Sequence, residues 1–98
     1  MKGILITPET QSVEEISYDE DNIAKLLDCS IWETVMVGRK TMFCVDEEGL
    51  FHPEKARFAW FNAHQPFFGK ALVVSFNEAG DFIDCLWSAE AVADCVSF

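Results

Sequence analysis

The stretch IWETVMVGRKTMFCV, residues 31–45, decides how this chain folds. Residues 31–37 alternate as a strand does, so that three aliphatic side chains share one face with Glu33. Residues 38–40 contain a glycine and are suited to a turn, and residues 41–45 predict the next strand. The stretch therefore predicts an antiparallel hairpin.

A second hairpin is expected at the start of the chain. Residues 2–7 predict a strand, and residues 11–17 predict its partner. Val13 and Ile16 are out of period, which indicates a bulge in that partner strand. Residues 17–20 then have the spacing of a capping box, so we expect a short amphipathic helix to begin there.

Beyond the central hairpin, the sequence predicts a turn and another helix. The acidic residues 46–49 end in glycine and are typical of a turn. Residues 54–62 follow a proline and are expected to be helical, with Phe58 and Phe61 on the buried face. Trp60 points elsewhere on such a helix, and this makes it the best candidate for an exposed contact residue.

The last third of the chain predicts one more hairpin and a final helix. Residues 70–76 predict a buried strand, residues 77–80 a loop and residues 81–86 the partner strand. Ser88 is suited to be the N-cap of a short helix. The expected fold is α+β: a mostly antiparallel sheet of about five or six strands, with two or three short helices packed on it, in a single domain over residues 1–98.

The composition indicates a folded, acidic protein. The chain has 98 residues, of which 50% are hydrophobic and 13% aromatic, and this is too apolar for a disordered chain. Its formal net charge is -10, which disfavours direct binding to nucleic acid and to anionic membranes. The charge suits a protein partner with a basic surface.

The acidic residues are concentrated toward the two ends of the sequence. Residues 1–33 have a net charge of -6 and residues 71–98 a net charge of -5. Residues 34–70 have a net charge of +1 and contain most of the aromatic side chains. If the two ends meet in the fold, one acidic face opposes a nearly neutral aromatic one.

The cysteines indicate a reducing compartment. The four cysteines include no Cys-x-x-Cys pair, and neither His52 nor His64 lies at ligand spacing from a cysteine. We expect no metal site and no cofactor. The sequence contains no secretory leader and no apolar run of membrane-spanning length, so we expect a cytoplasmic protein with reduced thiols.

No familiar catalytic motif is present. The sequence contains no phosphate-binding glycine loop and no nucleophile elbow, and an EF-hand loop is also missing. A cysteine paired in space with a histidine is left open by the sequence. The carboxylate clusters fall in predicted turns and helix starts, where solvation keeps the carboxylates alike. The candidate residues for binding a partner are Asp19, Glu20, Asp21, Asp46, Glu47, Glu48, Trp60, Asp81 and Asp84.

Four segments, in order, resemble a family of small proteins of unknown function found in phages, mobile elements and their bacterial hosts. They are MKGILITP (residues 1–8), IWETV (31–35), VDEEG (45–49) and FGKALVV (68–74). The resemblance carries over no catalytic residue. It implies an accessory gene whose product is cytosolic.

Three functions fit these observations. The first is a non-enzymatic accessory protein that acts by binding a protein, with an acidic inhibitor (a DNA mimic) of a host defence nuclease, such as a CRISPR or restriction complex, as its sharpest form. The second is a small structural or regulatory homo-oligomer. The third is a small-ligand-binding domain or minor enzyme that uses the aromatic region near His64.

Overall fold

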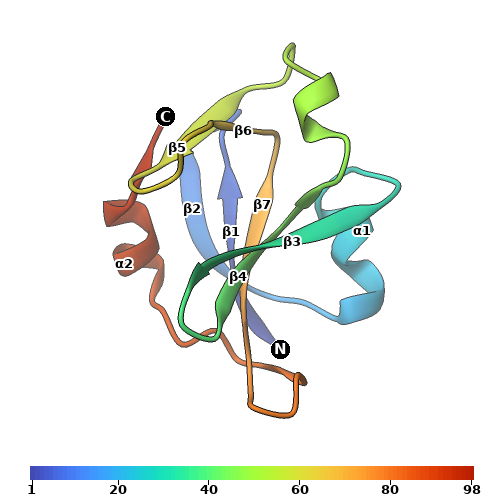
Figure 1. Ribbon diagram of the computed structural model, residues 1–98, viewed down its shortest axis with the longest axis vertical. Helices are drawn as coiled ribbons and strands as arrows, with labels where there is room; N and C mark the ends of the chain where they lie inside the picture. Colours follow the sequence, from blue (N-terminus) through green and yellow to red (C-terminus); the bar gives the residue numbers. More distant parts are fainter.

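Antiparallel strands dominate the computed structural model, with 42% of the residues in strands and 15% in helices (Figure 1). The structure describes residues 1–98, except for the side chain of Leu50. The expected α+β class is therefore wrong: two sheets make up the fold, and the helices are too short to form a layer. A helix of one or two turns gains little from its own hydrogen bonds and depends on the packing of its few apolar side chains.

The larger sheet has six strands. Five follow one another in the order β2-β1-β7-β4-β3, and β8 pairs with β7. The strands are β1 (Lys2–Thr7), β2 (Ser12–Ser17), β3 (Trp32–Gly38), β4 (Thr41–Asp46), β7 (Ala71–Phe76) and β8 (Phe82–Ile83).

The hairpins predicted at residues 31–45 and at the start of the chain are both confirmed. The bulge, however, is not where the sequence indicated it. The β1–β2 register runs without a shift from Lys2↔Ser17 to Thr7↔Ser12, and the irregularity lies in β3, between Met36 and Gly38. Val13 and Ile16 look out of period because they pack on opposite faces of β2, one in each half of the core.

The core is divided by the larger sheet into two clusters. On one face Phe43 lies edge-on to Phe58, Trp60 and Phe67, with ring centroids 5.8, 5.0 and 5.3 Å away. The other face is covered by η1 (Glu20–Asn22) and α1 (Ile23–Leu26), and its buried side chains are Leu5, Tyr18, Ile23, Leu27, Cys44, Leu72 and Val74.

A smaller sheet, in the order β6-β5-β9, covers the Phe43 face. Its strands are β5 (Arg57–Trp60), β6 (Phe67–Phe68) and β9 (Val96–Ser97). The helix expected over residues 54–62 is therefore wrong. Phe58 and Trp60 are buried at a strand spacing of two, whereas Phe61 is 69% exposed. Aromatic residues favour strands, and pairing with β6 and β9 decides between the two patterns.

The helix ends give one correction and one confirmation. The capping box expected at residues 17–20 is absent, since the N-cap Asp19 makes no side-chain hydrogen bond. Tyr18 is instead buried in the core. Ser88 does cap α2 (Ala89–Asp94), because its hydroxyl accepts a hydrogen bond from the Ala91 N–H at 3.1 Å. A last single turn, η2 (Gly49–Phe51), follows β4.

Candidate functional site

A cleft of about 350 Å³ lies beside β3, between this strand and the segment that joins β5 to β6. Its floor is apolar, with Val35, Val45 and Phe67 contributing, and its rim is acidic. The lining residues are Glu33, Val35, Val45, Asp46, Glu47, Gly49, Ala63, His64, Gln65, Pro66, Phe67 and Phe68.

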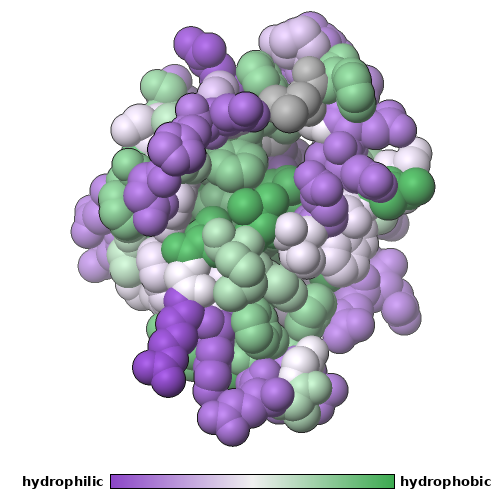
Figure 2. Space-filling model, viewed as in Figure 1, coloured by the Kyte–Doolittle hydropathy of each residue, from purple (hydrophilic) through white to green (hydrophobic). Residues whose placement is uncertain are grey.

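The apolar floor continues along the molecule. Figure 2 shows hydrophobic surface in the middle of this face, over β3, with hydrophilic side chains on both sides. Val35, Val37 and Trp87 are partly buried against the core here. Trp87 lies so close to β3 that a Cβ on Gly38 would meet its ring at 3.1 Å, and glycine is what permits this approach. The cleft is thus one end of an apolar band that follows β3.

β3 is also an edge of the larger sheet, because the strand order ends with it. Glu33, Thr34 and Met36 are exposed, and Met36 is 59% exposed. Ile31, directly before the strand, is 60% exposed. Unpaired backbone groups and an apolar cleft therefore lie side by side, an arrangement that suits the addition of another strand.

Asp46, at the end of β4, connects the cleft with a second hollow. Its side chain is 11% exposed and lines both cavities, the second of which measures about 520 Å³. One carboxylate oxygen, Oδ1, accepts a hydrogen bond from the Glu48 N–H at 2.9 Å. The other, Oδ2, lies 3.6 Å from the Lys55 Nζ. The carboxylate is thus held by the turn that follows β4 and by one lysine.

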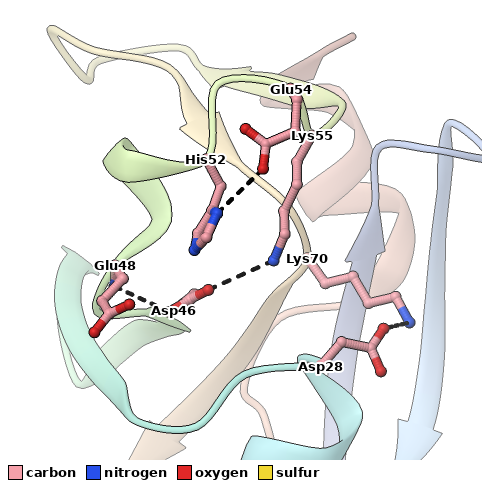
Figure 3. Close-up of polar contacts among 7 residues, drawn as sticks. All are labelled: Asp28, Asp46, Glu48, His52, Glu54, Lys55 and Lys70. Carbon is pink, nitrogen blue, oxygen red and sulfur yellow. Dashed lines mark hydrogen bonds and ion pairs between the residues drawn. The ribbon is translucent and has the colours of Figure 1, made fainter.

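Charged side chains from distant segments surround this second hollow. In Figure 3 the imidazole of His52 and the amine of Lys55 both point toward Asp46. His52 Nδ1 lies 3.1 Å from Glu54 Oε1. A hydrogen bond from its own backbone N–H and then one from His52 lower the pKa of Glu54. The cluster is thus held by the Asp46–Lys55 ion pair and by the contact between His52 and Glu54 at the surface.

The cysteine beside this cluster is not activated. Cys29 and His52 both line the second hollow, so the structure does bring one cysteine and one histidine together. Burial and then the negative charge of Asp46 raise the pKa of the Cys29 thiol, although Lys55 opposes them. A thiol that stays protonated is a poor nucleophile, so this arrangement gives no support to covalent chemistry.

The predicted partner-binding acids lie at both ends of the larger sheet. Asp46 ends β4 at the Ala71 end of β7, and Glu47 and Glu48 follow it, whereas Asp81 precedes β8 at the Phe76 end. The six residues of β7 separate the two groups by roughly 17 Å. The structure therefore does not gather these acids on one surface.

Asp84 and the acids before α1 lie toward the same end of the larger sheet as Asp81, because Lys2 of β1 is level with Ser75 of β7 and pairs with Ser17 of β2. Asp84 Oδ1 accepts a hydrogen bond from the Lys2 N–H at 2.8 Å. Burial raises the pKa of Tyr18 to about 12, and the charges of Glu20 and Asp84 add to that effect, so both acids lie near this tyrosine. Asp19 and Asp21 flank Glu20 and are exposed.

Trp60 is not the exposed contact residue that the sequence predicted. It is 3% exposed and packs against Phe43, Phe61 and Trp87. Its indole Nε1 is buried without a hydrogen-bond partner in the described part of the chain. The error follows from the misassigned helix, since a strand turns Trp60 inward beside Phe58.

Of the residues that line the cleft, the sequence singled out Asp46 and Glu47 by their charge and the region near His64 by its aromatic side chains. Glu33 and Val35 carried a usable signal, because an acid on the apolar face of a strand predicts that this face is not fully covered. Nothing in the sequence indicated that residues 63–66 lie beside Val35, since that position depends on contacts between distant parts of the chain.

The described residues offer neither a metal-binding group nor a helix able to span a membrane. Among the described residues, no group of three or more His, Cys, Asp and Glu side chains is placed to hold a metal ion. Within the same residues, no helix has the length and hydrophobicity needed to cross a membrane.

Comparison with known proteins adds a family. Residues 1–91 match the model of a family described as a domain of unknown function, DUF3846. The match covers the segments on which the resemblance was based, and it supports an uncharacterised family without indicating a phage or mobile-element origin. The search of curated proteins and the search of solved structures each found no match.

Proposed function

We propose that this chain, which belongs to the DUF3846 family, is a non-catalytic protein-binding domain that takes an extended segment of a partner protein in the cleft beside β3. One observation carries the proposal: the open edge of β3 borders a cavity with an apolar floor and an acidic rim. Strand addition at such an edge obtains affinity from backbone hydrogen bonds and specificity from side-chain pockets.

The charge of the chain supports a basic segment as the occupant. Glu33, Asp46 and Glu47 line the cleft, and the whole chain has a net charge of -10. Lys55 neutralises Asp46 in part, but Glu33 has no ion-pair partner among the described residues. Complementary charge speeds association and rejects acidic competitors.

The anti-defence role is the finer part of the proposal. A nuclease of a defence complex handles nucleic acid and carries basic segments of the kind that this cleft suits. A mimic of DNA needs its acids spread along one surface, whereas here they lie at both ends of the sheet. The binding of a basic segment is therefore the form of inhibition that the geometry supports best. Purified restriction and CRISPR nucleases, assayed with and without the protein, test it directly.

A display selection tests the binding function itself. A library of random linear peptides is selected on the wild-type chain, and the enriched peptides are measured against the Thr34→Pro variant. Because the Thr34 N–H faces away from β4, proline there leaves the sheet ladder intact and removes an outward donor. We expect binding about ten-fold weaker or worse, since each hydrogen bond contributes about 1 kcal/mol and the ring also obstructs the edge.

The matched control is Glu15→Pro on β2, which removes an outward N–H from the opposite edge of the same sheet. Circular dichroism and thermal unfolding establish that both variants fold. Peptides that bind the wild-type chain and the β2 variant equally, and bind Thr34→Pro weakly, support the proposal. A selection that enriches nothing, or peptides indifferent to Thr34→Pro, would overturn it.

A further inference from the structure

The direction of the backbone groups on β3 can be derived from one hydrogen bond. The Ile31 carbonyl accepts from the Glu47 N–H at 3.0 Å, so Ile31 faces β4. In an antiparallel ladder, alternate residues of a strand bond to the same neighbour. Glu33 and Val35 therefore also bond to β4, and the N–H and C=O groups of Trp32, Thr34 and Met36 point out from the edge.

The residues of β3 whose backbone groups bond to β4 are the ones whose side chains face the cleft. The register pairs Glu33 with Val45 and Val35 with Phe43, and Glu33, Val35 and Val45 all line the cleft. The residues with outward backbone groups have their side chains on the other face of the sheet. A strand added to this edge would hydrogen-bond to one set of residues and meet the side chains of the other set.

We infer that the partner segment binds as an antiparallel strand and presents, from its N- to its C-terminus, a large apolar residue, any residue and a basic residue. This inference rests on the proposed function. The apolar residue lies opposite Val35 and enters the cleft of about 350 Å³. In antiparallel pairing the residue two positions later lies opposite Glu33, where a lysine or arginine meets the unpaired carboxylate.

The choice of an antiparallel strand has a physical reason. Every pairing recorded in the larger sheet is antiparallel, so an antiparallel addition continues the geometry and twist already present at β3. Antiparallel pairs are also slightly more stable per residue than parallel ones. Direction matters for the motif, because reversing the strand reverses the order of the apolar and basic residues.

The residue between the two recognition positions lies opposite Thr34. Its side chain points to the other face of the sheet, where Thr34 and Met36 are both exposed. The residue before the apolar one lies opposite Met36 and gains contact with its thioether chain. These positions tolerate threonine and other β-branched residues, which suit a strand without adding specificity.

Synthetic peptides test the pairing. The reference is Ser-Thr-Phe-Thr-Lys-Thr-Ser, and its binding is followed through the amide signals of the isotope-labelled chain. In antiparallel pairing the threonine between phenylalanine and lysine bonds to Thr34, so N-methylation of that threonine should abolish binding. N-methylation of the phenylalanine should leave binding within about two-fold, because that amide points away from β3.

A charge exchange tests the basic position. Replacing the peptide lysine with glutamate should weaken binding about three-fold or more, and the Glu33→Lys variant should restore it, as expected for one exposed pair of charges. Glu14→Lys on β2 makes the same change in net charge at the opposite edge and should not restore binding.

The outcomes separate the inference from the proposed function. The reverse N-methylation pattern means a parallel strand, and insensitivity at both positions means contact through side chains alone. Either result overturns the inference, even when displayed peptides still depend on Thr34. Sedimentation shows whether the chain self-associates. If the peptide fails to bind only when the chain is self-associated, a second copy of the chain occupies the β3 edge, and this also overturns the inference. A failed display selection removes the proposed function itself.

Discussion

The two edges of the larger sheet, β2 and β3, are built differently. β2 carries two adjacent exposed acids, Glu14 and Glu15, and α2 packs against it (Figure 1). β3 carries one acid, Glu33, and exposes apolar side chains at and beside the strand. Proteins normally protect edge strands with charge, cover or distortion, because open edges pair with other chains. The β2 edge has such protection and the β3 edge has less of it, and this difference is what the proposed partner binding rests on.

The β2 and β3 edges can be compared directly because both have backbone groups that point out from the sheet. Met1 and Tyr18 exchange two hydrogen bonds, of 2.8 and 3.1 Å, at the end of the β1–β2 ladder. By the same alternation as in β3, the backbone groups of Val13, Glu15 and Ser17 point out from β2. Each edge thus offers three outward residues, and the difference lies in their surroundings.

The largest expected effect is a loss of folding stability at high pH, which would remove both edges of the sheet together. Burial raises the pKa of Cys44 to about 12 and, with help from nearby charges, that of Tyr18 to about 12. These groups lose their protons at lower pH in the unfolded chain, so stability is complete below about pH 9 and falls as pH rises toward 12. One unit of pKa shift corresponds to about 1.4 kcal/mol, so the loss should reach several kcal/mol.

Urea unfolding measured across this pH range checks the expected loss. In the Cys44→Ala variant the free energy of unfolding should be lower at neutral pH and should fall less steeply from pH 9, where the free thiol ionises in the unfolded chain. Identical slopes in the variant and the wild-type chain would contradict the assignment to Cys44.

A smaller effect is expected from a substitution in α2, which should expose β2 and leave β3 unchanged. Val92 is fully buried in α2 and belongs to the cluster against which Val13 packs. Val92→Ala should reduce the free energy of unfolding by about 2 kcal/mol, through lost transfer energy and the cavity left behind. Hydrogen exchange should accelerate in β2 more than in β3. Equal acceleration in both strands would mean that α2 does not protect β2 specifically.

Hydrogen exchange should also sharpen the contrast within β3. In the free chain the amides of Thr34 and Met36 should exchange about ten-fold faster than those of Glu33 and Val35, which bond to β4. A saturating selected peptide should slow Thr34 and Met36 and leave the amides of β2 unchanged. Slowing of both edges would indicate general stabilisation rather than pairing at β3.

The substitutions with the smallest expected effect on stability test how readily each edge aggregates. Met36→Lys should protect β3 as the acids protect β2, and Glu15→Met should expose β2 in return. Both substitutions are on the surface, so the free energy of unfolding should change by about 0.5 kcal/mol or less. Light scattering on heating should show slower aggregation for Met36→Lys and faster aggregation for Glu15→Met. The opposite order would mean that β3 is not the more adhesive edge.

Local sequence predicted much of the larger sheet. The hairpin at residues 31–45 was predictable because a strict period of two ends at a glycine turn. Residues 57–60 were not, since Phe58 fits both a helical pattern with Phe61 and a strand pattern with Trp60. The strands that settle the choice, β6 and β9, lie several to many residues further along the chain.

The candidate site was harder to predict than the fold. Asp46 and Glu47 were identified as candidates from their charge, and both line the cleft. Glu33 and Val35 were placed correctly on one face, but nothing local shows that the loop before β6 leaves a cavity over them. The acids proposed near the chain ends were assigned by composition, which has no information on where the sheet would put them.

The bulge between Met36 and Gly38 limits how long any complex at this edge can last. Regular outward bonding is confined to Trp32–Met36, so a bound segment is held by few hydrogen bonds. Contacts of this size dissociate quickly, and residence time accounts for most differences in affinity. A lasting complex would then require several weak contacts acting together, through repeated segments in the partner or a second surface of this chain.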